Sequence, residues 1–204
     1  MADNAIVHLV DDDEDVRRAL AFLLGTAGLA VRVYESANAL LDKLDRPQSG
    51  CIVSDVRMPG IDGIQLLQHL KAKNVTLPVI IMTGHADVAL AVGAMKAGAV
   101  DFIEKPFSDE VLLVAIEGAL ARQGKPGEPD SQAAAPVRSR IASLSEREKQ
   151  VLDGLLAGHP NKTIAYDLGI SPRTVEVHRA SVMKKMACAS LSELVRMTLL
   201  AGTF

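Results

Sequence analysis

Short apolar runs alternate with helical patterns along the first 122 residues, and this alternation restricts the possible folds more than any other feature. The runs are rich in β-branched residues and predict strands near 5–10, 30–34, 51–55, 79–83 and 100–104. Amphipathic patterns predict helices near 14–27, 36–45, 63–73, 87–97 and 108–122. Five such repeats predict an α/β fold, a parallel sheet with helices on both faces. The strands scarcely alternate between apolar and polar residues, as expected for strands buried on both sides.

Four of these runs end in residues that can bind a cation or a phosphoryl group. Acidic residues follow the first and third runs, a hydroxyl ends the fourth, and an ammonium follows the fifth: Asp11, Asp12 and Asp13; Asp55; Thr83; Lys105. Ligands of open α/β sheets bind beyond the carboxyl ends of the strands, so these side chains should share one pocket. The peptide bond between Lys105 and Pro106 is a candidate cis bond, because proline lowers the cost of that isomer.

The residue types in this pocket suit phosphoryl transfer to a carboxylate. Asp55 is the candidate acceptor, since a carboxylate can attack phosphorus when nearby groups neutralise the charge that develops. Asp11 and Asp12 offer hard oxygen ligands for Mg²⁺, while Thr83 and Lys105 can bond phosphate oxygens. Each residue alone also has a simpler interpretation, because acidic residues before a helix can merely complement its dipole. The four run endings together favour the pocket.

The composition bears on the cellular location of the protein. No apolar stretch reaches the roughly 18 residues of a membrane span, and the N-terminus lacks the features of a signal peptide. We therefore expect a cytoplasmic protein. The two cysteines, Cys51 and Cys188, have neither metal-ligand spacing nor a disulfide pattern.

The second part of the chain differs from the first in charge and pattern. Residues 1–121 carry 10 Lys and Arg against 17 Asp and Glu, whereas residues 122–204 carry 12 against 8. The first part therefore suits cations and the second suits polyanions, although this mild basicity is weak evidence for nucleic acid. Residues 123–140 are rich in Gly, Pro, Ala and polar residues and predict a flexible linker.

Residues 141–204 predict four helices. Their starts carry capping signals at Ser145 with Glu148, at Ser171 with Pro172, and at Ser190 with Glu193. The helix near 161–168 meets the next one through a short turn at Gly169 and Ile170, as in a helix-turn-helix.

Several side chains of this helix pair are candidates for DNA contact. A recognition helix places its N-terminal residues near base edges, while basic residues around it reach phosphates. Those expected at the DNA are Lys162, Thr163, Arg173, Thr174, Val177, His178, Arg179, Lys184 and Lys185. His178 could equally serve in helix packing, and Glu176 should repel phosphates unless it accepts from a cytosine amino group.

Residues 1–122 resemble a response-regulator receiver domain. Asp11, Asp12, Asp55, Thr83 and Lys105 match the acidic pair, phosphoacceptor, switch hydroxyl and lysine of that family, and residues 55–60 with Asp62 and Gly63 match its loop after the third strand. The resemblance implies a CheY-like, flavodoxin-like doubly wound sheet of order 2-1-3-4-5 and phosphotransfer from a histidine kinase. It also implies Mg²⁺ or Mn²⁺ held by the acidic pair, Asp55 and the backbone carbonyl of Arg57. Phe102 stands at the aromatic switch position, where the family often has Tyr.

Residues 141–204 resemble the LuxR-type helix-turn-helix domain, from Leu144-Ser145-Glu146-Arg147-Glu148 through Asn161-Lys162 to Thr174-Val175 and His178. The whole chain therefore resembles regulators of the NarL/FixJ family, and residues 82–87 are most similar to its FixJ branch. This implies a transcription activator linked to oxygen limitation and nitrogen fixation, whose partners are a cognate kinase, promoter DNA and RNA polymerase. Its only expected catalysis is Mg-dependent self-phosphorylation and slow autodephosphorylation.

Phosphorylation is expected to change one face of the receiver. We hypothesise that Thr83 moves toward the phosphate and that Phe102 fills the vacated space. The change would bias a face with exposed apolar groups beside two charges, suited to a two-fold contact between copies: Val88, Val92, Met95, Lys96 and Asp101. Ordinary packing of these apolar side chains is the simpler alternative.

Two other classes of function remain open. A phosphoaspartyl hydrolase of the haloacid dehalogenase type would need a second acid two positions after Asp55, and this position holds Arg57. The helical domain could also give a phosphorylation-dependent protein-binding output that does not involve DNA.

Overall fold

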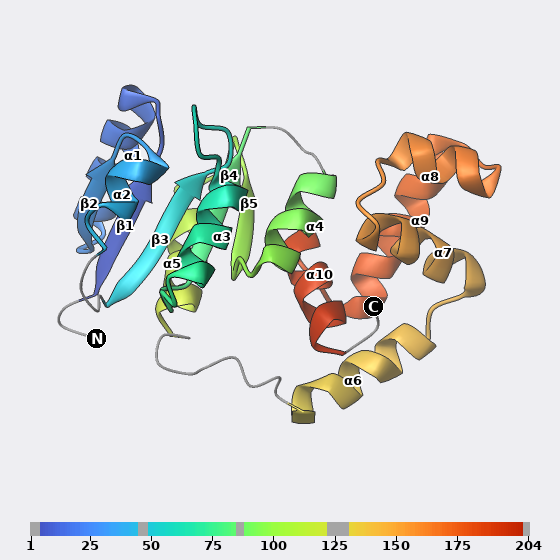
Figure 1. The fold of residues 1–204 in the computed structure, drawn as a ribbon. Coiled ribbons are helices and arrows are strands. Elements are labelled where there is room, and N and C mark those ends of the chain that lie inside the picture. Colours follow the sequence, from blue (N-terminus) through green and yellow to red (C-terminus); the bar gives the residue numbers. More distant parts are fainter. Residues whose placement is uncertain (1–4, 45–48, 85–87, 122–130, 202–204) are drawn as a thin grey trace. The chain divides into compact units, whose positions relative to one another are not determined.

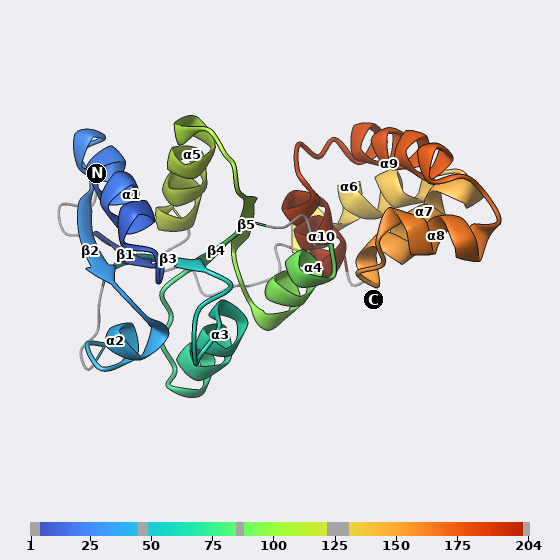
Figure 2. The same cartoon turned by 90° about the horizontal axis from the view of Figure 1, so that it is seen from above.

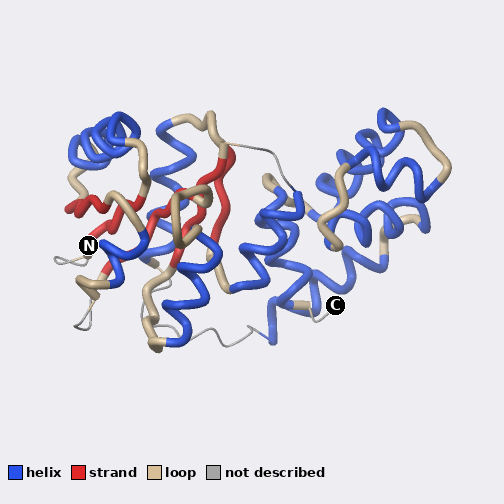
Figure 3. The backbone as a smooth tube through the Cα atoms, turned by 45° about the horizontal axis from the view of Figure 1, so that its top comes forward, coloured by secondary structure: helices blue, strands red, loops and turns tan. Residues whose placement is uncertain are grey.

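The computed structural model describes residues 5–44, 49–84, 88–121 and 131–201. They belong to two compact units, one formed by residues 1–86 with 97–126 and the other by residues 87–96 with 127–204. Within the described residues, the strands all lie in the first unit (Figure 3).

The first unit contains the predicted five-stranded parallel sheet (Figure 1). Its strand order is β2-β1-β3-β4-β5, which confirms the order 2-1-3-4-5. The central strands are fully buried, as their continuous apolar runs predict. The strands are β1 (Ile6–Val10), β2 (Ala30–Tyr34), β3 (Gly50–Asp55), β4 (Val79–Thr83) and β5 (Asp101–Glu104).

Four helices of the first unit cover the two faces of the sheet (Figure 2). Helices α1 (Glu14–Thr26) and α5 (Asp109–Leu120) lie on one face, and α2 (Ala37–Leu41) and α3 (Gly63–Ala72) lie on the other. Leu24 and Ile116 are among the side chains that form the core under α1 and α5. Helix α2 ends at Leu41, earlier than the predicted boundary at 45.

The second unit is helical. It contains α4 (Val88–Ala97), α6 (Ser131–Ala142), α7 (Glu146–Leu156), α8 (Asn161–Leu168), α9 (Pro172–Met186) and α10 (Leu191–Leu200). Helices α7 to α10 are the four predicted from the sequence. Gly169 ends α8 in the left-handed conformation, and Ser171 caps α9, so the helix-turn-helix prediction is confirmed for α8 and α9.

Helix α6 is the main departure from the expected arrangement, because it lies largely within the predicted linker of residues 123–140. Residues 122–130 are outside the described part. From Ser131 onward the chain is helical despite Pro136, and Val137 is buried. The alanines that precede this proline favour a helix. Composition alone did not show that the segment has neighbours to pack against.

No helix within the described residues is long and apolar enough to span a membrane.

Candidate functional site

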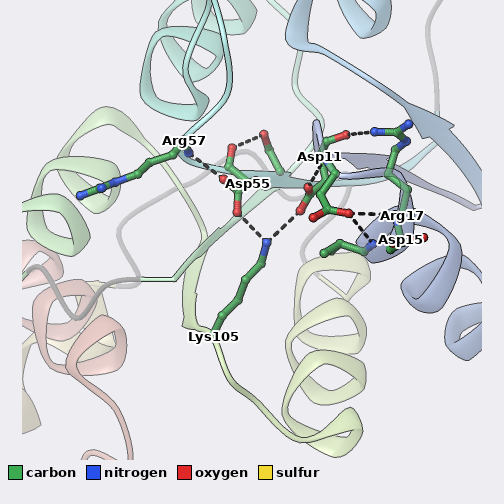
Figure 4. Close-up of polar contacts among 9 residues, drawn as sticks. Asp11, Asp15, Arg17, Asp55, Arg57 and Lys105 are labelled. Carbon is green, nitrogen blue, oxygen red and sulfur yellow. Dashed lines mark hydrogen bonds and ion pairs between the residues drawn. The ribbon is translucent and has the colours of Figure 1, made fainter.

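Two carboxylates and one ammonium meet at the carboxyl edge of the sheet (Figure 4). Asp55 is the last residue of β3, Asp11 directly follows β1, and Lys105 directly follows β5. The Lys105 Nζ atom lies 2.6 Å from Asp55 Oδ1 and 2.8 Å from Asp11 Oδ2. The sheet therefore brings together three of the predicted pocket residues, although 94 positions separate Asp11 from Lys105.

Backbone hydrogen bonds fix both carboxylates. The Arg57 amide donates to Asp55 Oδ2 at 2.7 Å, and the Asp13 amide donates to Asp11 Oδ1 at 2.9 Å. The Arg17 guanidinium donates to the backbone oxygen of Asp11 at 2.6 Å. Asp11 is 2% exposed and Asp55 is 8% exposed. These anions are thus held at the rim of the core, where electrostatic interactions are stronger than in water.

The environment of Lys105 favours its charged form. Burial alone would lower the pKa of the Lys105 ammonium, but hydrogen bonds and charges from Asp11 and Asp55 raise it above its usual value. Because the folded-state pKa is raised, this pairing stabilises the protein at neutral pH and is lost as the pH rises through that pKa. The pocket thus presents a permanent cation beside the candidate acceptor.

Thr83 and Phe102 lie near this edge on β4 and β5. Thr83 is fully buried, and its backbone oxygen accepts from the Lys105 amide at 2.7 Å. Phe102 is half-buried, and the Lys105–Pro106 bond is cis as predicted. The switch roles of Thr83 and Phe102 remain predictions.

The donor chemistry of the pocket suits Mg²⁺, which usually takes one or two carboxylates together with waters and phosphate oxygens. Asp11 and Asp55 are close enough to share one cation, since both bond the same ammonium. Asp12 is exposed, and no three Asp, Glu, His or Cys side chains of the described segments gather as a ready metal site. Asp11, Asp12, Asp55 and the Arg57 carbonyl remain the predicted ligand set.

Replacing Lys105 with Met is expected to destabilise the first unit by about 2 kcal/mol at pH 7, because it leaves two buried carboxylates unpaired. This is below the usual cost of breaking a buried pair, since the Lys105 side chain is 24% exposed. Urea unfolding would measure the loss.

A divalent cation also tests whether the cost of losing Lys105 comes from two unneutralised carboxylates. If Mg²⁺ can neutralise the two carboxylates, it should raise the unfolding midpoint of Lys105→Met more than that of the wild type. Adding Asp11→Asn to Lys105→Met should recover part of the lost stability. Equal Mg²⁺ effects on both proteins would contradict the prediction.

Two apolar residues of the predicted dimer face are buried rather than exposed. Val92 and Met95 are buried, and the Lys96 ammonium donates to the backbone oxygen of Leu156 at 3.4 Å. Asp101 is half-buried and accepts from the Phe102 amide. The side chain of Val88 lies outside the described part. The dimer face therefore remains a prediction that requires these apolar side chains to be uncovered.

The candidate DNA-contacting residues fall into two groups. Lys162, Arg173, Val177 and Lys184 are exposed, while Thr163, Thr174, His178 and Arg179 are half-buried. Val177 is 63% exposed on α9, so its side chain is free to contact a base methyl group. The Thr174 hydroxyl is already engaged with that of Ser171 at 2.8 Å.

Lys185 has a structural partner that the sequence did not reveal. Its ammonium donates to Glu148 on α7 at 2.7 Å, and the Ser181 hydroxyl of α9 donates to the same carboxylate. Glu148 also closes the predicted capping box with Ser145. Glu148 therefore ties the start of α7 to α9. These bonds, those from Lys185 and Ser181 foremost, lower the pKa of Glu148 to about 2.

Replacing Glu148 with Gln is expected to lower the unfolding temperature of the helical unit at pH 7, because the amide cannot accept from Lys185 and Ser181 equally well. The folded-state pKa of Glu148 lies below the unfolded value of 4.5, so its stabilisation is complete above pH 4.5 and declines as pH falls toward 2. Between pH 4.5 and 2, the unfolding temperature of Glu148→Gln should depend less on pH than that of the wild type.

Glu146→Gln is the matched control, since Glu146 lies in the same first turn of α7 but is exposed. It should leave the pH dependence nearly unchanged. A loss of equal size in both variants would mean that Glu148 acts only on the helix dipole.

The sequence analysis gave no role to two further arginines, because they lie in the predicted linker. Arg138 and Arg140 of α6 bond backbone oxygens at the ends of other helices. No local motif marks them, since the partners are 63 and 46 positions away.

Comparison with known proteins agrees with both halves of this description. Residues 7–117 match the response regulator receiver domain, and residues 142–198 match the luxR family of bacterial regulatory proteins. The transcriptional regulatory protein FixJ of Azorhizobium caulinodans is 57% identical over 99% of this chain and 95% of its own length. FixJ of Bradyrhizobium diazoefficiens is 53% identical over 96% of this chain and 95% of its own length. The crystal structure of full-length FixJ from B. japonicum has a TM-score of 0.56 and 52% identity, covering 98% of each chain.

Proposed function

Because the chain belongs to the NarL/FixJ family of response regulators, as a FixJ-like transcription regulator, we propose that Asp55 accepts a phosphoryl group from a histidine kinase and that this controls sequence-specific DNA binding. One observation carries the proposal. The Asp55 carboxylate is held beside Asp11 and the Lys105 ammonium, on a chain that also contains a helix-turn-helix.

The pocket supports the chemistry of that transfer. An Asp55 carboxylate oxygen forms a bond to phosphorus while the bond from phosphorus to the donor's imidazole nitrogen breaks, and the imidazole leaves. Lys105 is within reach of the acceptor carboxylate and can neutralise charge on the phosphoryl oxygens. Mg²⁺, held by the acidic residues, would supply further charge neutralisation. Thr83 would then bond the phosphoryl group through its hydroxyl.

The expected output is a change in protein association and DNA affinity. Dimerisation through the face of Val88, Val92, Met95, Lys96 and Asp101 would pair two DNA-binding domains on one site. Recruitment of RNA polymerase at genes for nitrogen fixation and low-oxygen growth follows from the resemblance to FixJ, and so does a cytoplasmic location.

A three-part measurement tests this function. The full chain is incubated with acetyl phosphate and Mg²⁺, and its mass, oligomeric state and DNA affinity are then measured. The duplex is one that the wild-type protein selects from a randomised library, and the salt concentration is fixed. We expect one added phosphoryl group, a dimer, and tighter binding on the order of tenfold.

Other outcomes would favour the alternatives. Phosphorylation-dependent dimers with unchanged DNA affinity would indicate a protein-binding output. Repeated turnover of phosphate esters would indicate a hydrolase. Absence of a phosphorylated species would contradict the proposed role of Asp55.

A further inference from the structure

Helix α6 lies almost entirely outside both family matches, yet it is built into the helical unit. The receiver match ends at residue 117 and the luxR match begins at 142, the last residue of α6. Val137 of α6 is 6% exposed, and α6 packs against both α9 and α10. This segment therefore has a tertiary role that neither domain family explains.

Two arginines of α6 reach the ends of the helices that it touches. The Arg138 Nε atom donates to the backbone oxygen of Ala201, directly after α10, at 3.1 Å. The Arg140 Nη1 atom donates to the backbone oxygen of Met186, the last residue of α9, at 3.0 Å. The last carbonyl groups of a helix have no partners within it and carry partial negative charge, so a guanidinium stabilises them.

The two helices held in this way pack against each other, and one of them carries the candidate base contacts. Helix α9 carries the exposed Val177 and the other candidate base contacts, and α10 packs against it. A shift of the C-terminal end of α9 would change how its N-terminal residues meet a major groove, because the helix moves as one rod. Helix α9 ends with Ala187 in the left-handed conformation, and the Ala187 amide donates to the backbone oxygens of Lys184 and Met183. The Met186 oxygen accepts from Arg140 and, at 3.6 Å, from the Cys188 thiol.

We propose that α6 contributes to DNA binding as part of the helical unit. Arg138 and Arg140 are positioning residues: Arg138 holds the C-terminal end of α10, and Arg140 holds that of α9. This inference rests on the proposed function, because it assigns α6 a share of the DNA affinity. Neither arginine needs to touch DNA.

The test compares variants of the full chain on the duplex selected by the wild type. Arg138→Gln and Arg140→Gln remove the charge and the forked donors, and Arg140→Lys keeps the charge and one donor. The double Gln variant should bind roughly fivefold to thirtyfold more weakly, while Arg140→Lys recovers part of the loss due to Arg140→Gln. Arg18→Gln is the matched control, because Arg18 is an exposed arginine of the first unit whose side chain pairs with Glu14 and Asp15 of its own helix, α1.

The salt dependence of binding separates positioning from direct contact. An arginine that neutralises a phosphate contributes about 0.9 to the slope of log affinity against log salt concentration, so its loss would reduce that slope. We expect the slope of the double variant to match that of the wild type while its affinity falls. Thermal unfolding should show that the variant remains folded at the assay temperature.

Several results would overturn the inference. These are affinity within twofold of wild type, a slope reduced by about one for each arginine removed, an equal loss in Arg18→Gln, or a loss that only follows the unfolded fraction. A wild-type protein that selects no duplex would instead contradict the proposed DNA-binding function, which keeps the two failures distinguishable.

Discussion

Asp55→Asn is expected to abolish phosphoryl incorporation from acetyl phosphate or a phosphorylated kinase, as measured by intact-protein mass. The asparagine amide is not a nucleophile toward phosphorus under these conditions. Asp55 Oδ1 meets Lys105 at 2.6 Å and Oδ2 meets the Arg57 amide at 2.7 Å. An asparagine oxygen can replace only one of these acceptors, so its amide group must face a donor.

The fold should nevertheless survive this substitution. Lys105 keeps its bond to Asp11, so we expect the free energy of unfolding to change by no more than about 1 kcal/mol. Asp62→Asn is the matched control, because Asp62 caps α3 and asparagine caps a helix equally well. The control should incorporate phosphoryl like the wild type. Phosphorylation of Asp55→Asn at wild-type yield would place the acceptor elsewhere.

Gly63→Ala is expected to cost about 2–4 kcal/mol of stability and to slow phosphorylation, because this glycine packs against the backbone of the acceptor. An added Cβ would lie 2.5 Å from the Asp55 backbone oxygen and 3.0 Å from Val56 Cα. These are main-chain atoms and cannot rotate away. Either the start of α3 or the Asp55 peptide would have to move, and the latter would displace the nucleophile.

The control for this substitution is Gly25→Ala in α1, where an added Cβ meets nothing within 4 Å. Alanine has the higher helix propensity, so this variant should be as stable as the wild type or slightly more stable. For both variants, urea unfolding measures the stability, and the initial rate of phosphoryl incorporation measures the reactivity of the acceptor. A Gly63→Ala protein with wild-type stability and rate would show that α3 does not constrain the acceptor.

The receiver pocket could be predicted because its signals are local. In a parallel sheet every strand carboxyl end lies at the same edge, so residues directly after apolar runs must become neighbours whatever lies between them. Asp11, Asp55 and Lys105 therefore followed from position alone. The exact pairing did not, since sequence could not show that one ammonium would bridge both carboxylates.

The helical unit shows the opposite case. Capping residues placed the starts of α7 and α9, because a side chain that bonds a backbone amide three residues away is a local interaction. Lys185 was predicted to contact phosphates, and the structure adds a partner that the sequence did not reveal, Glu148, 37 positions away. The partners of a long side chain depend on how helices pack.

The sequence by itself predicted the strands, the candidate acceptor carboxylate at a strand end and the helix-turn-helix, because periodicity, strand ends and caps are properties of neighbouring residues. The strand order was implied by the resemblance to receiver domains, and the structure confirms it. Only the tertiary structure decided that α6 is a packed helix, that its arginines close the ends of α9 and α10, and that Val92 and Met95 are buried. The physical reason is that burial and helix-end contacts join residues distant in the chain. Their energies depend on packing that no local pattern encodes.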